Sequence, residues 1–200
     1  MIWRALAEAA GRVYCDPNRT RVGAIEYATY TVESSPVFAI AGTNGWRDWI
    51  CNLHRARQPF SLRGRRCLAH AGFLRAARAI YTDFGHWQRQ VQGPVSIVGH
   101  SQGAALSAII AMIAEAEAQG SIKRLCCVAM PRVGDQALAD AFGELFPDPD
   151  KYRLYGRRRD PVCHLPYFGY SRLAPYAWLP SQWDGRLDHG VCQYIKLITE

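Results

Sequence analysis

The residue pattern with the clearest chemical meaning is Gly99-His100-Ser101-Gln102-Gly103, a G-x-S-x-G pentapeptide. An apolar run, Val95–Val98, precedes it, and an Ala-rich segment follows it through Ala118. A strand, a tight turn and a helix in this order predict a nucleophile elbow, which presents a serine hydroxyl at a helix N-terminus where negative charge is stabilised. Glycines suit positions 99 and 103 because strand and helix backbones approach closely there. The alternative interpretation is an ordinary Gly-Ser turn.

A serine nucleophile needs a base to accept its proton and a carboxylate to orient that base. The histidines that follow Ser101 are His164 and His189, and the α/β-hydrolase order is serine, acid, histidine. His189 precedes the last predicted helix, and Asp160 follows a predicted strand over Tyr152–Tyr155. We therefore predict that Ser101 is the nucleophile, Asp160 the acid and His189 the base.

Both partners of the serine have simpler interpretations. Asp160 follows Arg157–Arg159 and is also explained by a salt bridge to these arginines. His189 is also explained as a solvent-exposed loop histidine. Pro161 favours extended backbone at Asp160, which limits the directions that the carboxylate can take.

Strands alternate with helices along the chain, which indicates an α/β class with a mostly parallel sheet covered by helices on both faces. No repeat and no linker is visible, so we expect a single domain over residues 1–200. A turn is expected at Ser34–Pro36, an Arg-rich loop with Pro59 and Gly64 up to about Arg66, and a long loop over 156–187. Helices are expected at 2–14, 46–53, 70–91, 102–118, 137–145 and 191–198, and strands at 24–32, 37–41, 95–98, 125–130 and 152–155.

The composition is that of a globular protein, with 49% hydrophobic and 20% charged residues in a chain of 200. No apolar run approaches the roughly 20 residues that span a bilayer, so no integral membrane segment is expected. Arg4 and Glu8 interrupt the opening apolar pattern, which favours an amphipathic helix over a signal peptide and a cytoplasmic location. Seven cysteines without metal-ligand spacing favour free thiols and no metal site.

The net charge of +7 is due almost entirely to arginine. The densest groups are Arg63-Gly-Arg-Arg66 and Arg157–Arg159. A basic surface of this kind suits an anionic lipid or another polyanion, although a solvated basic face is the simpler interpretation. No nucleic-acid-binding motif accompanies these arginines, so a nucleic-acid partner is not expected.

Several separated stretches together resemble the class 3 (fungal-type) lipase family. They are Gly42-Thr43 followed by Asp48-Trp-Ile-Cys-Asn-Leu53, His70-Ala-Gly-Phe73, the elbow Gly99–Gly103, Met130-Pro-Arg-Val-Gly134, Arg159-Asp-Pro-Val-Cys-His-Leu-Pro166, and Asp188-His189 with Tyr194. The resemblance implies an α/β-hydrolase fold and the same assignment of Ser101, Asp160 and His189. It also implies an oxyanion hole formed by Thr43 and the backbone N–H of Gln102, with no cofactor. Thr43 is also explained as a cap of the predicted helix 46–53.

In the predicted helix 46–53, Trp46, Trp49, Ile50 and Leu53 fall on one face. Ordinary burial in the core explains this face, whereas the resemblance implies a short lid helix that covers the elbow and contacts a lipid interface.

The activity implied by the resemblance is hydrolysis of carboxylic esters of lipids or small molecules, as in a lipase or esterase. Phospholipase A1, feruloyl-type esterase and acyltransferase activities are the enzymatic alternatives. A hydrolase scaffold that binds a ligand without turnover is the alternative outside enzymes.

Overall fold

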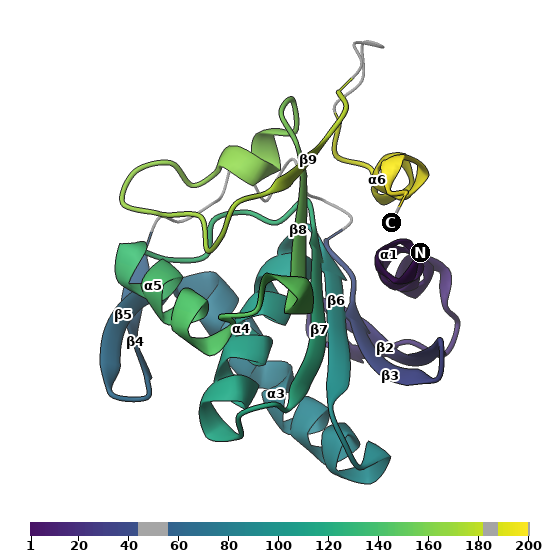
Figure 1. The fold of residues 1–200 in the computed structure, drawn as a ribbon, viewed down its shortest axis with the longest axis horizontal. Coiled ribbons are helices and arrows are strands. Elements are labelled where there is room, and N and C mark those ends of the chain that lie inside the picture. The colour runs from purple at the N-terminus through teal and green to yellow at the C-terminus, as the bar shows by residue number, and fades with distance from the viewer. Residues whose placement is uncertain (44–55, 182–187, 200) are drawn as a thin grey trace.

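A twisted β-sheet forms the centre of the protein (Figure 1). The computed structural model describes residues 1–43, 56–181 and 188–199, and within them seven strands pair in the order β1-β2-β3-β6-β7-β8-β9. Strands β3, β6, β7, β8 and β9 run parallel, and β1 and β2 add an antiparallel edge. The mostly parallel sheet predicted from the sequence is therefore confirmed. The strands are β1 (Thr20–Val22), β2 (Ile25–Val32), β3 (Ser35–Ile40), β6 (Val95–His100), β7 (Ile122–Val128), β8 (Tyr152–Arg157) and β9 (Ala177–Leu179).

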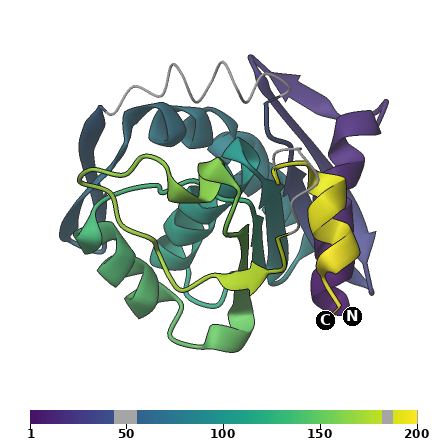
Figure 2. The same cartoon turned by 90° about the horizontal axis from the view of Figure 1, so that it is seen from above.

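Helices cover both faces of this sheet. The helices α1 (Ile2–Arg12) and α6 (Val191–Leu197) pack against each other on one face, and their positions place the two chain ends side by side (Figures 1 and 2). The other face carries α3 (Ala71–Val91), α4 (Gln102–Glu117) and α5 (Gln136–Leu145). The connections between these elements include three short 3-10 helices, η1 (Val13–Cys15), η2 (Pro149–Lys151) and η3 (Pro161–His164).

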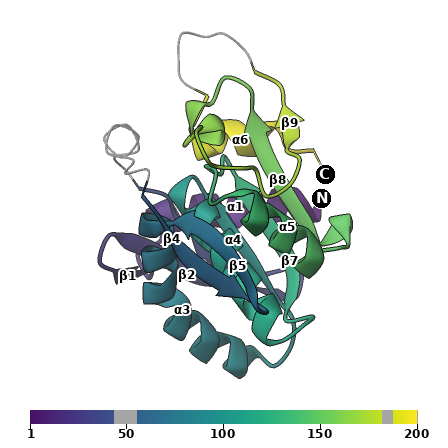
Figure 3. The same cartoon turned by 90° about the vertical axis from the view of Figure 1, so that its left-hand side faces the viewer.

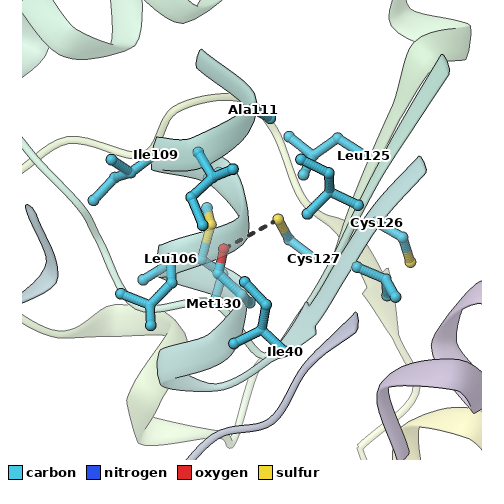
Figure 4. Packing of buried hydrophobic residues seen from close by; sticks show 14 of the residues in the cluster. Ile40, Leu106, Ile109, Ala111, Leu125, Cys126, Cys127 and Met130 are labelled. Carbon is cyan, nitrogen blue, oxygen red and sulfur yellow. Dashed lines mark hydrogen bonds between the residues drawn. The ribbon is translucent and has the colours of Figure 1, made fainter. Parts of the chain in front are cut away.

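The core is densest where α4 packs on β6 and β7 (Figure 4). Every residue of β6 is buried, and α4 is apolar on nearly all sides, as expected for elements covered all round. Cys127 points from β7 toward α4, where its Sγ lies 3.4 Å from the carbonyl oxygen of Ala104, whereas Cys126 points to the opposite side of the strand. Successive side chains of a β-strand point to opposite faces of the sheet. The two adjacent cysteines therefore pack as small apolar groups on opposite faces of β7. Cys127 is a free thiol.

A β-hairpin occupies the segment that the sequence predicted as an Arg-rich loop. Strands β4 (Arg57–Leu62) and β5 (Arg65–His70) pair antiparallel and pack on α3, α4 and α5 (Figure 3). The loop prediction was wrong because the turn is confined to Arg63 and Gly64, both with positive φ, as two-residue hairpin turns require. Pro59 is tolerated since the hairpin has only two strands, and Phe60 is buried beneath it.

Two further local predictions need correction. The predicted turn Ser34–Pro36 is instead a turn at Glu33 and Ser34, which have positive φ, and β3 begins at Ser35. The predicted long loop 156–187 contains the end of β8, η3 and β9. The predicted helix 46–53, with its lid residues, lies outside the described residues. Within the described part of the chain, no helix has the length and apolar character needed to cross a membrane.

Candidate active site

The elbow places Ser101 at the carboxyl end of β6 and the start of α4. Ser101 has φ 58° and ψ −125°, a strained conformation for a residue with a side chain. A Cβ on Gly99 would lie within 3.0 Å of the Gly103 backbone, and a Cβ on Gly103 would lie equally close to the carbonyl oxygens of Ile40 and Ala41. Only glycine therefore fits at either position, for the steric reason inferred from the sequence.

The structure brings Ser101, His189 and Asp160 together, although they lie far apart in the sequence. His189 Nε2 is 2.9 Å from Ser101 Oγ, and His189 Nδ1 is 2.9 Å from Asp160 Oδ2 and 3.1 Å from Asp160 Oδ1. All three side chains are buried. Because the ionised carboxylate can only accept, Nδ1 carries the ring proton and Nε2 is left to accept the serine proton.

The carboxylate of Asp160 is held by donors on both oxygens. Oδ1 accepts the backbone N–H of Val162 at 2.9 Å, since Asp160 caps η3, and Oδ2 accepts the hydroxyl of Tyr194 at 2.7 Å. Burial, with the neighbouring Cys163 and Asp160 adding to it, raises the pKa of the Tyr194 phenol, so this group stays a donor. In the sequence, Tyr194 is part of the resemblance to the lipase family but has no assigned role. No local sequence pattern indicates its hydrogen bond to Asp160.

A buried ion pair fixes the loop that carries His189. Arg157 lies 2.9 Å from Asp188 Oδ1, with both side chains almost completely buried, and its Nε donates to the carbonyl oxygen of Pro180 at 3.0 Å. The sequence alternative was a salt bridge between Asp160 and the preceding arginines, but Arg157 pairs with Asp188. Arg157 therefore does not compete with the imidazole of His189 for the Asp160 carboxylate.

The loop after β3 lies directly against the serine. A Cβ on Gly42 would come within 2.8 Å of the Ser101 Cβ, so the next residue, Thr43, lies beside the elbow. The hydroxyl oxygen of Thr43 is buried and has no hydrogen-bond partner among the described residues. Gln102 is the first residue of α4, where a backbone N–H has no acceptor within the helix. Two polar groups thus remain available near Ser101 Oγ.

A second histidine links the base to this loop. His100 Nε2 is 2.9 Å from the carbonyl oxygen of His189, and His100 Nδ1 is 2.7 Å from the hydroxyl of Tyr14. The Tyr14 hydroxyl also accepts the backbone N–H of Gly42 at 2.8 Å. Tyr14 must then donate to Nδ1, and Nε2–H donates to the carbonyl. Burial, with the nearby His189 adding to it, lowers the pKa of His100 to about 3, so the ring is neutral.

Two other histidines, which lie in stretches that resemble the lipase family, make different contacts. His70 accepts the backbone N–H of Phe73 at 3.3 Å and caps α3. His164 stacks on Trp178 with ring centroids 5.8 Å apart and receives a hydrogen bond from Arg172. Among the described residues, no group of three histidine, cysteine or acidic side chains is arranged to hold a metal ion.

A comparison with protein families identifies the family of this chain. A family described as "Lipase (class 3)" matches residues 37–170, which span β3, the elbow and Asp160. The chain belongs to the class 3 lipase family. Among curated proteins, this class 3 lipase is 29% identical over 85 residues to "Secreted mono- and diacylglycerol lipase MDL4" of Malassezia globosa. The match covers 42% of this chain and 28% of that relative, so it spans less than a third of the relative's length.

Solved structures of fungal lipases share the fold of this class 3 lipase. The mono- and diacylglycerol lipase from Aspergillus oryzae superposes with a TM-score of 0.72 at 18% identity, covering 92% of this chain and 81% of that one. A mutant form of MDLA from Penicillium cyclopium superposes with a TM-score of 0.69 at 20% identity, covering 93% and 80%. At these identities the similarity establishes the α/β architecture, and the chemistry rests on the site itself.

Proposed function

We propose that this class 3 lipase hydrolyses carboxylic esters of lipids, with Ser101 as nucleophile, His189 as general base and acid, and Asp160 as the group that orients the imidazole. The observation that supports this most directly is the buried chain from Ser101 Oγ to His189 Nε2 and from Nδ1 to Asp160, with contacts of 2.9 Å. Family membership supports the class of reaction.

In the first half of the reaction, Ser101 Oγ attacks the acyl carbonyl carbon while His189 Nε2 accepts the hydroxyl proton. Asp160 stabilises the imidazolium that forms and keeps Nδ1–H directed at its carboxylate. Collapse of the tetrahedral intermediate expels the alcohol, which takes the proton from Nε2 and leaves the acyl group on Ser101. A water molecule then attacks this ester, His189 accepts and returns its proton, and the free acid leaves.

We assign the stabilisation of the developing oxyanion to Thr43 and to the backbone N–H of Gln102. The buried Thr43 hydroxyl without a partner among the described residues supports this assignment, as does the N–H at the first position of α4. Each well-aimed donor of this kind contributes about 3 kcal/mol to transition-state stabilisation. The N-terminus of α4 adds favourable electrostatics at the same point.

For the substrate we propose mono- and diacylglycerols. The class 3 family assignment supports this choice, as does the similarity to mono- and diacylglycerol lipases from Malassezia globosa and Aspergillus oryzae. Phosphatidylcholine and feruloyl esters serve as comparison substrates because they share the acyl bond and differ in the alcohol or acid.

Labelling with a fluorophosphonate probe tests the nucleophile, and acid release from the three substrate types tests the specificity. Wild-type protein should be labelled and should release acid fastest from acylglycerols, and Ser101→Ala should do neither. Ser107→Ala is the matched control, because Ser107 is a buried serine on the same helix α4 whose hydroxyl has no partner in the described structure. Unlabelled wild-type protein would contradict the proposal and favour a binding module, and faster phosphatidylcholine cleavage would contradict the substrate choice.

A further inference from the structure

Two aromatic side chains project from the loop that follows η3. Tyr167 is 61% exposed and Phe168 is 71% exposed, and apart from Met1 they are the exposed large hydrophobic residues of the described chain. Their rings contact each other edge to face, with centroids 5.3 Å apart. Exposing an adjacent aromatic pair to water is unfavourable, so the pair marks a contact surface.

Arginine side chains surround this pair. Arg132 lies 4.9 Å from the ring of Tyr167, and its Nη1 donates to the carbonyl oxygen of Tyr167 and to that of Tyr170, each at 3.2 Å. Arg57, from β4, donates to the carbonyl oxygen of Gly169 at 2.7 Å. These contacts bind the guanidinium groups to carbonyl oxygens of the loop, which carry no formal charge.

The arginine group continues over the neighbouring aromatic residues. Arg172 lies over the rings of Tyr176 and Trp178, at 5.7 and 5.4 Å, and Arg158 lies over Trp178 at 5.3 Å. Burial, with the charge of Arg172 adding to it, lowers the pKa of Arg132.

Among the described residues, carboxylates pair with other arginines and not with these four. In the described part of the chain, no carboxylate lies within ion-pair distance of Arg57, Arg132, Arg158 or Arg172. Six other arginines do have such a partner: Arg4, Arg19, Arg21, Arg65, Arg153 and Arg157. A positive patch held by carbonyl oxygens and rings can therefore accept an external anion without first breaking an ion pair.

This patch lies at the end of the sheet where the active site lies. The loop that carries it follows Asp160 through η3, and in Figures 1 and 3 this segment extends from the end of β8, on the side where β6 ends at Ser101. A flat charged body bound to the patch would therefore lie at the end of the sheet that carries Ser101.

We propose that an anionic phospholipid bilayer binds this aromatic–arginine surface, which comprises Arg57, Arg132, Arg158, Tyr167, Phe168 and Arg172. The guanidinium groups pair with lipid phosphates, and the two exposed aromatic side chains enter the interface between headgroups and acyl chains. A bilayer fits better than a nucleic acid because guanidinium groups already lie over the rings of Tyr176 and Trp178, which leaves fewer rings on which bases could stack. This inference goes beyond the proposed function, since adsorption requires no ester cleavage.

Cosedimentation with vesicles tests the inference in a Ser101→Ala background, so that failure of catalysis and failure of binding are measured separately. The probes are vesicles of phosphatidylcholine and vesicles that contain in addition about 30% phosphatidylglycerol. We expect at least about tenfold stronger partitioning to the anionic vesicles. Arg172→Gln and Arg158→Gln should each lower it about fivefold, and Phe168→Ser about tenfold.

Arg89→Gln is the matched control, because Arg89 is exposed near the end of α3 at the opposite end of the sheet and also has no carboxylate partner in the described structure. It should bind as the parent does, with circular dichroism confirming that all variants are folded. Equal binding to both vesicle types, or an equal loss in Arg89→Gln and Arg172→Gln, would overturn the proposal. Polyadenylate serves as a competitor that tests for a general polyanion site. If it displaces the protein from vesicles and its own binding is unaffected by Phe168→Ser, the ligand of this surface is a polyanion and the bilayer proposal is wrong.

Discussion

His100 Nε2 lies 2.9 Å from the carbonyl oxygen of His189, so the residue before the proposed nucleophile holds the backbone of the proposed base. From the other ring nitrogen, the contact continues through the hydroxyl of Tyr14 to the backbone N–H of Gly42. One hydrogen-bonded chain therefore joins three segments that must converge on the ester: the elbow, the base loop and the loop of Thr43. Tyr14 and His100 act as positioning residues, since neither is placed to touch the reacting atoms.

Removing the Tyr14 hydroxyl should uncouple these segments. In Tyr14→Phe, the N–H of Gly42 loses its acceptor, and the adjacent Thr43 loses its fixed position beside Ser101. Because an oxyanion donor acts mainly in the transition state, we expect kcat to fall about tenfold with little change in KM. Tyr30→Phe is the control, since the Tyr30 hydroxyl bonds Asp16 at 2.7 Å outside the site. Equal kcat in the two variants, or a change confined to KM, would contradict this role.

The buried His100 should make stability depend on pH. Its pKa in the folded protein is about 3, below the ordinary value of 6.5, so between these values the unfolded chain binds a proton that the folded chain does not. Stability from this group is complete above pH 6.5 and falls with pH down to about 3, by at most about 1.4 kcal/mol per pH unit.

Denaturant unfolding of wild type and His100→Gln between pH 7 and the acid range measures this contribution as a difference in slope. The variant should lose less stability per pH unit than wild type, whatever its stability at pH 7. His86→Gln, at an exposed position on α3, controls for the loss of a histidine side chain. Parallel curves for wild type and His100→Gln would contradict this expectation, because they would show that folding leaves the pKa of the ring unchanged.

The residues that could be named from the sequence are those with local signatures. Ser101 stands in a short pattern with its own steric logic, and Asp160 and His189 follow from chain order and from their positions after a strand and before a helix. Tyr14 carries no such signature, because its partner His100 is 86 positions away and only the packing of α1 and η1 on the sheet brings them together. The same holds for Tyr194 and Asp160, which are 34 positions apart.

The errors in predicting the fold have the same physical origin. Pro59 and a run of arginines favour a loop when considered locally, but the packing of Phe60 against helices stabilises a hairpin there. Tertiary contacts therefore override the local propensity of β4 and β5. The parallel strands are easier to predict from the sequence. Strand β6, for example, is buried on both faces and is therefore a continuous run of mostly apolar residues.

The hydroxyl of Tyr194 should matter for both stability and rate. It donates to Asp160 at 2.7 Å and accepts the backbone N–H of Arg157 at 3.0 Å, so Tyr194→Phe leaves a buried donor unpaired. We expect a loss of about 1 to 3 kcal/mol in the free energy of unfolding. We also expect a several-fold fall in kcat, because the Asp160 carboxylate is then less firmly oriented. Tyr27→Phe, which removes a comparable bond to Asp83, should lower stability with unchanged kcat, and an equal kcat in both variants would contradict the role of Tyr194.

Two glycines that both lie in helices should respond to alanine in opposite directions. A methyl group on Gly103 would collide with the carbonyl oxygens of Ile40 and Ala41, and these are backbone atoms at the end of β3 that cannot turn aside as a flexible side chain would. We therefore expect Gly103→Ala to lower the free energy of unfolding by about 3 kcal/mol or more and to abolish esterase activity by displacing the elbow. Gly143, in α5, has open space around its Cβ position, and Gly143→Ala should raise stability by about 0.5 to 1 kcal/mol with activity unchanged. Denaturant titration and hydrolysis of a soluble ester measure both effects, and a Gly103→Ala protein as stable and active as wild type would refute the close approach of α4 to β3.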